Sequence, residues 1–262
     1  MSDLKPSWER MWAEPESPGR QFLLGEIGRK FSTQNPTQTI NDIMNVEDPA
    51  DRVELFRASF RGDFQSYFAD EKQLKVLRQA VETMPESVRS VGAAELAWST
   101  AAQDPMGAAE VISQYPAVAE TSNLIENIAI RMVGKVDLGA AQTWADSLPT
   151  PEALGRGYSG IVSGHYSEDS EATSRWVQTL PPGPGRDAAA SALANSAKED
   201  DPEAAFAWAR SIQDGNQRTA STELVVKSWA AADQTAAMAA LEQSNLPLEQ
   251  KDALMKTLLG PQ

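Results

Sequence analysis

The sequence predicts an all-α chain in which similar pairs of helices stack into an α-solenoid. Two residue types carry this prediction, because alanine and tryptophan each recur at a step of 32 residues. The alanines are Ala108, Ala140, Ala172, Ala204 and Ala236, and the tryptophans are Trp144, Trp176 and Trp208. A fixed step between about 20 and 50 residues is typical of stacked repeats, in which each unit contacts only its neighbours.

The repeated unit reads as helix–turn–helix, most clearly over residues 201–232. Asp201 suits an N-cap and Pro202 suits the first helical position. Apolar residues then recur at steps of three and four, which predicts a helix of about 11 residues. A turn at 213–216 leads into a second helix with its own apolar stripe, and Asp233 caps the next unit.

The same unit can be followed along most of the chain, with a spacing of 32 to 35 residues and about seven helix pairs. Clear copies begin at Asp104, Asp137, Asp169, Asp201 and Asp233, and weaker copies begin at Asn35 and Asp70. We therefore expect an irregular segment and capping helix over residues 1–34, and a solenoid over 35–262 with clear repeats from 104. We also expect the last unit to lack a full second helix, since terminal repeats are atypical.

Two features of the middle of the chain depart from the repeat. Four glycines fall within residues 155–164, inside an expected second helix, which predicts a bend there. His165, the only histidine, occupies an inward-facing position that Val133, Ala197 and Trp229 hold in other units. A packed, locally hydrogen-bonded histidine is therefore favoured over a catalytic base.

No pattern predicts a catalytic residue, a cofactor or a metal site. The chain has no cysteine and one histidine, which excludes thiolate zinc and histidine-rich metal sites. Ser159 lacks the second glycine and the strand of a nucleophile elbow, and residues 181–187 lack the lysine of a phosphate loop. Acidic clusters recur at helix starts, which favours a capping role over a role as paired catalytic carboxylates. A calcium site is not excluded by these clusters, but the ordered loop pattern of known calcium sites is absent. Three arginines that follow turns are expected to bind turn carbonyls or a neighbouring acid in preference to a ligand: Arg156, Arg186 and Arg218.

The charge of the chain restricts its partners. With 23 basic and 37 acidic residues the net charge is −14, so a nucleic-acid partner is not expected, whereas a basic protein could be attracted. No stretch approaches the roughly 20 apolar residues that span a bilayer, so no membrane partner is expected either. The N-terminus has no apolar signal core, which makes a cytoplasmic location the default, with an exported form whose signal was removed as the alternative.

Two outward columns on the first helices are the expected binding surface, because their residues vary while the inner columns repeat. The columns are Glu110, Gln142, Ser174, Phe206 and Met238, and Gln114, Asp146, Gln178, Arg210 and Glu242. Phe206 and Met238 are adjacent apolar residues that form either an anchor patch or a contact with a neighbouring helix. We take Phe206, Met238, Arg210 and Gln178 as the candidate partner-binding residues.

The segments DPEAAFAWARSI, DLGAAQTWADSLP and DSEATSRWVQTLP share the pattern D-x-x-A-x-x-x-W, which the first of them extends to D-P-x-A-A-x-x-W. In this pattern the chain resembles uncharacterised bacterial α-helical repeat proteins and, more loosely, the tetratricopeptide and HEAT classes. The resemblance covers residues 104–260 well and 35–103 poorly, and the tetratricopeptide signature W-x-x-L-G-x-x-Y is absent. It implies a right-handed α-solenoid used in protein–protein contact, and no binding residue is carried over from it.

A non-catalytic scaffold that binds a protein or peptide along its surface is therefore the leading hypothesis. Two alternatives remain from the residues alone. One is an α/α enzyme with an acidic cleft, which needs two carboxylates about 5–10 Å apart across a pocket. The other is an acidic decoy that binds a basic protein in place of nucleic acid.

Overall fold

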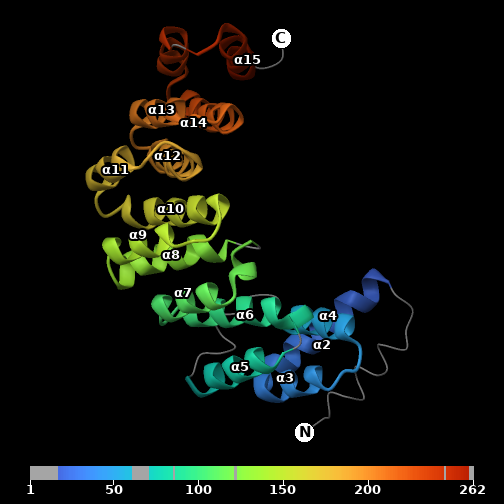
Figure 1. Cartoon of the computed structure of the whole chain (residues 1–262). Helices are drawn as coiled ribbons and strands as arrows, with labels where there is room; N and C mark the ends of the chain where they lie inside the picture. Colours follow the sequence, from blue (N-terminus) through green and yellow to red (C-terminus); the bar gives the residue numbers. More distant parts are fainter. Residues whose placement is uncertain (1–16, 61–70, 85, 121–122, 245, 260–262) are drawn as a thin grey trace. The chain divides into compact units, whose positions relative to one another are not determined.

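The computed structural model describes residues 17–60, 71–84, 86–120, 123–244 and 246–259. Across these residues the regular structure is helical and contains no strand, which confirms the all-α class (Figure 1). The chain divides into two compact units, residues 1–124 and 125–262.

In the first unit, helices pair as the weaker sequence copies predict. Its elements are α2 (Pro18–Gln34), α3 (Pro36–Met44), α4 (Pro49–Phe60), α5 (Glu71–Thr83), α6 (Glu86–Ala101), α7 (Pro105–Gln114) and the 3₁₀-helix η2 (Pro116–Glu120). The pairs α3/α4 and α5/α6 match the copies expected from Asn35 and Asp70, although Asp70 itself lies outside the described residues. Helix α2 already starts at Pro18, where an irregular segment was expected, because proline is well tolerated at the first helical position.

In the second unit, first and second helices alternate along the chain. They are α8 (Leu124–Lys135), α9 (Leu138–Asp146), α10 (Pro151–His165), α11 (Ser170–Thr179), α12 (Pro184–Ala197), α13 (Pro202–Ser211), α14 (Gly215–Gln243) and α15 (Leu248–Leu259). Helix α12 packs against both α10 and α14, so second helices lie next to one another along this unit (Figure 1). Helix α15 has 12 residues, so the expectation of an incomplete second helix in the last unit was wrong.

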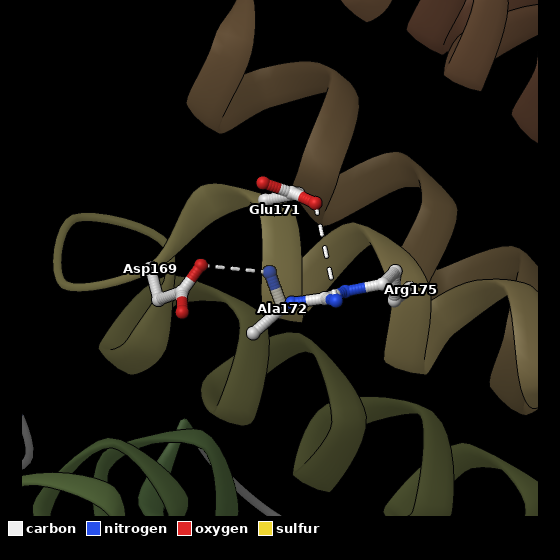
Figure 2. A network of polar contacts seen from close by, with 4 residues as sticks. All are labelled: Asp169, Glu171, Ala172 and Arg175. Carbon is white, nitrogen blue, oxygen red and sulfur yellow. Dashed lines mark hydrogen bonds and ion pairs between the residues drawn. The ribbon is translucent and has the colours of Figure 1, made fainter.

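The aspartates of the 32-residue period act as helix caps, as predicted. The Oδ1 atoms of Asp104, Asp137, Asp169, Asp201 and Asp233 each accept the backbone N–H three residues later, at 2.7–3.0 Å. Figure 2 shows the cap at Asp169, which accepts the N–H of Ala172 at 2.8 Å. Beside it, Glu171 and Arg175 form an exposed ion pair at 3.9 Å, one helical turn apart. Such pairs contribute about 0.3–0.5 kcal/mol, so the cap dominates this helix start.

The chain bends at Asp233 rather than in the glycine-rich helix. Asp233 interrupts α14 with φ −147° and ψ 92°, so α14 holds the second helix of one sequence unit and the first helix of the next. Helix α10, in contrast, runs through all four glycines as one α-helix. A Cβ at Gly160 would lie 2.7 Å from the Cβ of Ala129 on α8, and one at Gly157 would lie 3.0 Å from that of Ala145 on α9. The predicted bend was therefore wrong, because these glycines allow close helix contact.

A buried position of each first helix lies one residue after the predicted alanine column. The residues there are Ala109, Ala141, Thr173, Ala205 and Ala237, and none is more than 4% exposed. The alanines of the predicted column are half-buried apart from Ala108, and Trp176 and Trp208 are half-buried as well. Two of the three column tryptophans are therefore only partly covered, whereas Trp144 is buried at 8% exposed.

Candidate binding groove

A groove of about 520 Å³ lies in the second unit, between α13 and the part of α14 that follows Asp233. Its lining residues are Glu203, Phe206 and Arg210 of α13, Trp229, Ala236, Ala239, Ala240 and Gln243 of α14, and Ser244 at the end of α14. On α13 and on the final part of α14 these positions are spaced by one, three or four residues. Each wall is therefore one face of a helix.

Aromatic rings form the floor of the groove and hold each other in place. Phe206 is 5% exposed and Trp229 is 7% exposed, and their rings meet edge to face with centroids 6.2 Å apart. The guanidinium carbon of Arg210 lies 5.4 Å from the centroid of the Phe206 ring, which is a cation–π distance. Two packed rings that expose little of their surface thus lie beneath the groove, and a cation lies near one of them.

The groove exists because the tryptophan column stops. Position 240 is 32 residues after Trp208, yet it holds alanine, while Trp229 stands 32 residues after Ala197. In the preceding unit, Trp208 packs against the buried cluster that includes Ala197. The pair Ala197 and Trp208 of one unit thus corresponds to Trp229 and Ala240 of the next, with the large and the small side chain exchanged. The ring of Trp229 lies in the floor, and the space above Ala240 stays open to solvent.

Charged and polar groups stand on the rim. Glu203 is exposed in the first turn of α13, and Arg210 is half-buried in the last turn of that helix. Seven residues separate them, which corresponds to roughly 10 Å along the helix axis at about 1.5 Å per residue. On the other wall, Gln243 is exposed, and Ser244 is buried with its Oγ donating to Leu241 O at 2.6 Å.

The turn between α13 and α14 is fixed by consecutive residues of α12. Asp187 is 3% exposed, and its two carboxylate oxygens accept the backbone N–H groups of Gln213 and Asp214, both at 2.9 Å. Arg186 Nη1 donates to Ser211 O at 3.2 Å. These bonds hold the C-terminal end of α13 and the start of α14, and thereby the relative position of the helices that carry the groove.

Two of the three arginines expected at turn carbonyls are found there. Arg186 binds the carbonyl of Ser211, and Arg218 Nη1 donates to the carbonyls of Ile212 and Gln213 at 2.9 and 3.0 Å. Both contacts lie at the turn between α13 and α14. The predicted structural role of these two side chains is therefore confirmed.

The four candidate partner-binding residues do not form one patch. Phe206 and Arg210 both line the groove, whereas Gln178 is exposed on α11 outside it. Met238 is half-buried and is not among the lining residues. Phe206 is buried against Trp229, so of the two alternatives for this residue the packed one holds. The alanine wall and Trp229 were not singled out as site residues from sequence, although the alanine at position 240 was the available signal.

His165 has the local, structural surroundings that were predicted for it. Its Nδ1 lies 2.8 Å from Oγ1 of Thr173, and that hydroxyl donates to Asp169 O at 2.7 Å. Because the hydroxyl proton is committed to Asp169, the histidine Nδ1–H is the donor in the first bond. The side chain therefore links the end of α10 to the start of α11.

Tyr158 on α10 is the most perturbed phenol of the second unit. Burial raises its pKa, and the hydrogen bond to Asp146 and the negative charge of that carboxylate raise it further. The phenol Oη donates to Asp146 Oδ1 at 2.5 Å, and the ring meets Trp176 edge-on at 5.3 Å. These contacts connect α9, α10 and α11, which indicates a packing role.

Fold and groove together define an all-α protein with an aromatic-floored groove between two helices. No protein-family model matches the chain, and neither a curated protein nor a solved structure matches it. Over the described part of the chain, no helix combines the length and the apolar character needed to cross a bilayer. The described residues also contain no cluster of three or more histidine, aspartate or glutamate side chains arranged to hold a metal ion.

Proposed function

We propose that the chain is a non-catalytic scaffold that binds a protein or peptide in the groove between α13 and α14. The observation that supports this proposal is the composition of the groove, with two aromatic rings below, three alanines on one wall and opposite charges on the rim. Binding hot spots combine apolar anchoring with a polar rim in the same way. A volume of about 520 Å³ also lies within the range of about 300–1,000 Å³ typical of ligand pockets.

We further propose that the 32–35-residue period reflects a right-handed α-solenoid of about seven helix pairs, similar to bacterial α-helical repeat proteins. The repeated aspartate caps and the packing of α12 between α10 and α14 support this architecture. In such a fold an open groove between neighbouring first helices is a natural binding surface. An experimental structure with paired helices stacked in register from residue 35 onwards would test it, and a different packing order would contradict it.

The binding function can be tested by selecting peptides from a displayed random library on the purified chain. Ala240→Trp is the decisive variant, because it places an indole in the groove at the position where Trp208 stands one unit earlier. Thr235→Trp is the matched control, since it adds the same ring at an exposed position outside the lining. We expect Ala240→Trp to weaken the selected peptides at least about tenfold, which corresponds to about 1.4 kcal/mol, and Thr235→Trp to leave their affinity unchanged. Equal binding to both variants would contradict the proposal.

A further inference from the structure

We infer that the occupant of the groove is an amphipathic helix with a large apolar side chain between a basic and an acidic residue about seven positions apart. This inference rests on the proposed function and specifies the partner of the same site. It follows from three properties of the groove: the shape of its walls, the size of its apolar floor and the placement of its charges.

The walls have the shape that a helix fits. The lining positions of α14 after its break are 236, 239, 240 and 243, and those of α13 are 203, 206 and 210. Side chains at these spacings form ridges along a helix, and the groove between two such ridges receives the ridge of a third helix. Helix-in-groove recognition uses anchors at the same spacings.

The floor has room for one large side chain. A cavity of about 150 Å³ holds a benzene molecule, so a groove of about 520 Å³ accommodates an aromatic or leucine side chain together with part of its own helix. An aromatic side chain seated above Ala240 would meet the rings of Phe206 and Trp229 and the methyl groups of the alanine wall.

The charges set the sequence of the occupant. Glu203 and Arg210 stand about 10 Å apart along α13, and a helix lying beside α13 has the same rise per residue. A cation opposite Glu203 and a carboxylate opposite Arg210 are therefore about seven residues apart on the occupant, with the anchor between them. Residues 125–262 contain 18 acidic and 11 basic residues, a net charge of −7. This charge favours an occupant whose remaining residues, apart from the cation, the anchor and the carboxylate, are basic.

The test uses a synthetic fluorescent peptide of about 20 residues, long enough to form a helix in an alanine- and glutamine-rich host. It carries lysine, tryptophan and glutamate at positions i, i+4 and i+7, and binding is measured by fluorescence anisotropy. We expect Ala240→Trp and replacement of the peptide tryptophan by alanine each to weaken binding at least about tenfold. Glu203→Lys should weaken it up to about fivefold, as for an exposed ion pair. A peptide with glutamate in place of its lysine should recover that loss on the Glu203→Lys protein.

Failure of this inference can be separated from failure of the proposed function. If peptides from the random library require the open groove but lack the spaced lysine, anchor and glutamate, the inference is wrong and the binding function stands. Unchanged affinity after loss of the peptide tryptophan also overturns the inference. If neither the designed peptide nor any library peptide is sensitive to Ala240→Trp, both proposals are wrong.

Discussion

Asp187→Asn should destabilise the second unit strongly although it changes neither volume nor backbone. In the native chain both carboxylate oxygens of Asp187 accept backbone N–H groups at 2.9 Å, and the side chain is 3% exposed. Asparagine keeps one acceptor oxygen but presents an amide N–H₂ to the other backbone donor. One buried hydrogen bond to a charged group is then lost, which costs about 1.5–3 kcal/mol, and one N–H stays unpaired. We expect the free energy of unfolding to fall by about 2–3 kcal/mol.

This loss can be measured by urea unfolding followed by far-UV circular dichroism, with amide hydrogen exchange as the local probe. Exchange at Gln213 and Asp214 should accelerate, because their N–H groups are the ones that Asp187 binds. Asp252→Asn removes the same charge at an exposed position and should change stability by less than about 0.5 kcal/mol. If Asp187→Asn were as stable as this control, with unchanged exchange at both amides, the buried carboxylate would not be what fixes the turn.

Four further substitutions, one of them a matched control, test packing and burial. Glu95→Gln should remove a pH dependence of the free energy of unfolding. Desolvation raises the pKa of Glu95 well above its usual value, so the folded state keeps a proton that the unfolded chain releases above about pH 4.3. Wild-type stability should then fall with rising pH between the unfolded and folded pKa values, by up to about 1.4 kcal/mol per pH unit, and urea titrations of the variant across this interval should lack that fall. Gly160→Ala should cost about 1–3 kcal/mol in thermal unfolding because its methyl meets α8. Gly134→Ala, which points into open space, should gain roughly 0.5–1 kcal/mol, and equal effects of the two would contradict the close-approach argument. Tyr158→Phe should lower stability by about 1 kcal/mol through loss of the bond to Asp146, and an unchanged melting temperature would show that this bond contributes nothing.

The helices could be predicted from sequence because their signals are local. The cap aspartates of the clear repeats, two of which precede a proline, act through backbone bonds within three residues, and the structure contains those bonds at all five predicted aspartates. The pairs at 36–60 and 71–101 follow from the same kind of signal. The prediction of which residues are buried was less accurate. Adjacent alanines such as Ala204 and Ala205 share one sequence pattern, and only the packing of the helices decides that Ala205 is the buried one.

The groove could be predicted only in part. Phe206 and Arg210 were selected as outward residues, and both line it, but Phe206 turns inward against Trp229, a contact between helices that a single column does not reveal. The glycines of α10 were misread for a related reason, since a glycine that loosens a helix and one that admits a neighbour look alike in sequence. An empty space is also harder to detect than a residue, because Ala240 carries information only as the absence of a tryptophan.

The most direct measurement is an NMR titration of the chain, labelled at its alanine methyl groups, with the tightest peptide selected on it. The methyl resonances of Ala236, Ala239 and Ala240 should shift to saturation, because they form one wall of the groove. The methyls of Ala189 and Ala190, buried on α12, should stay in place. Saturable shifts that leave the three wall methyls unmoved, or that centre on α12, would contradict binding in the groove.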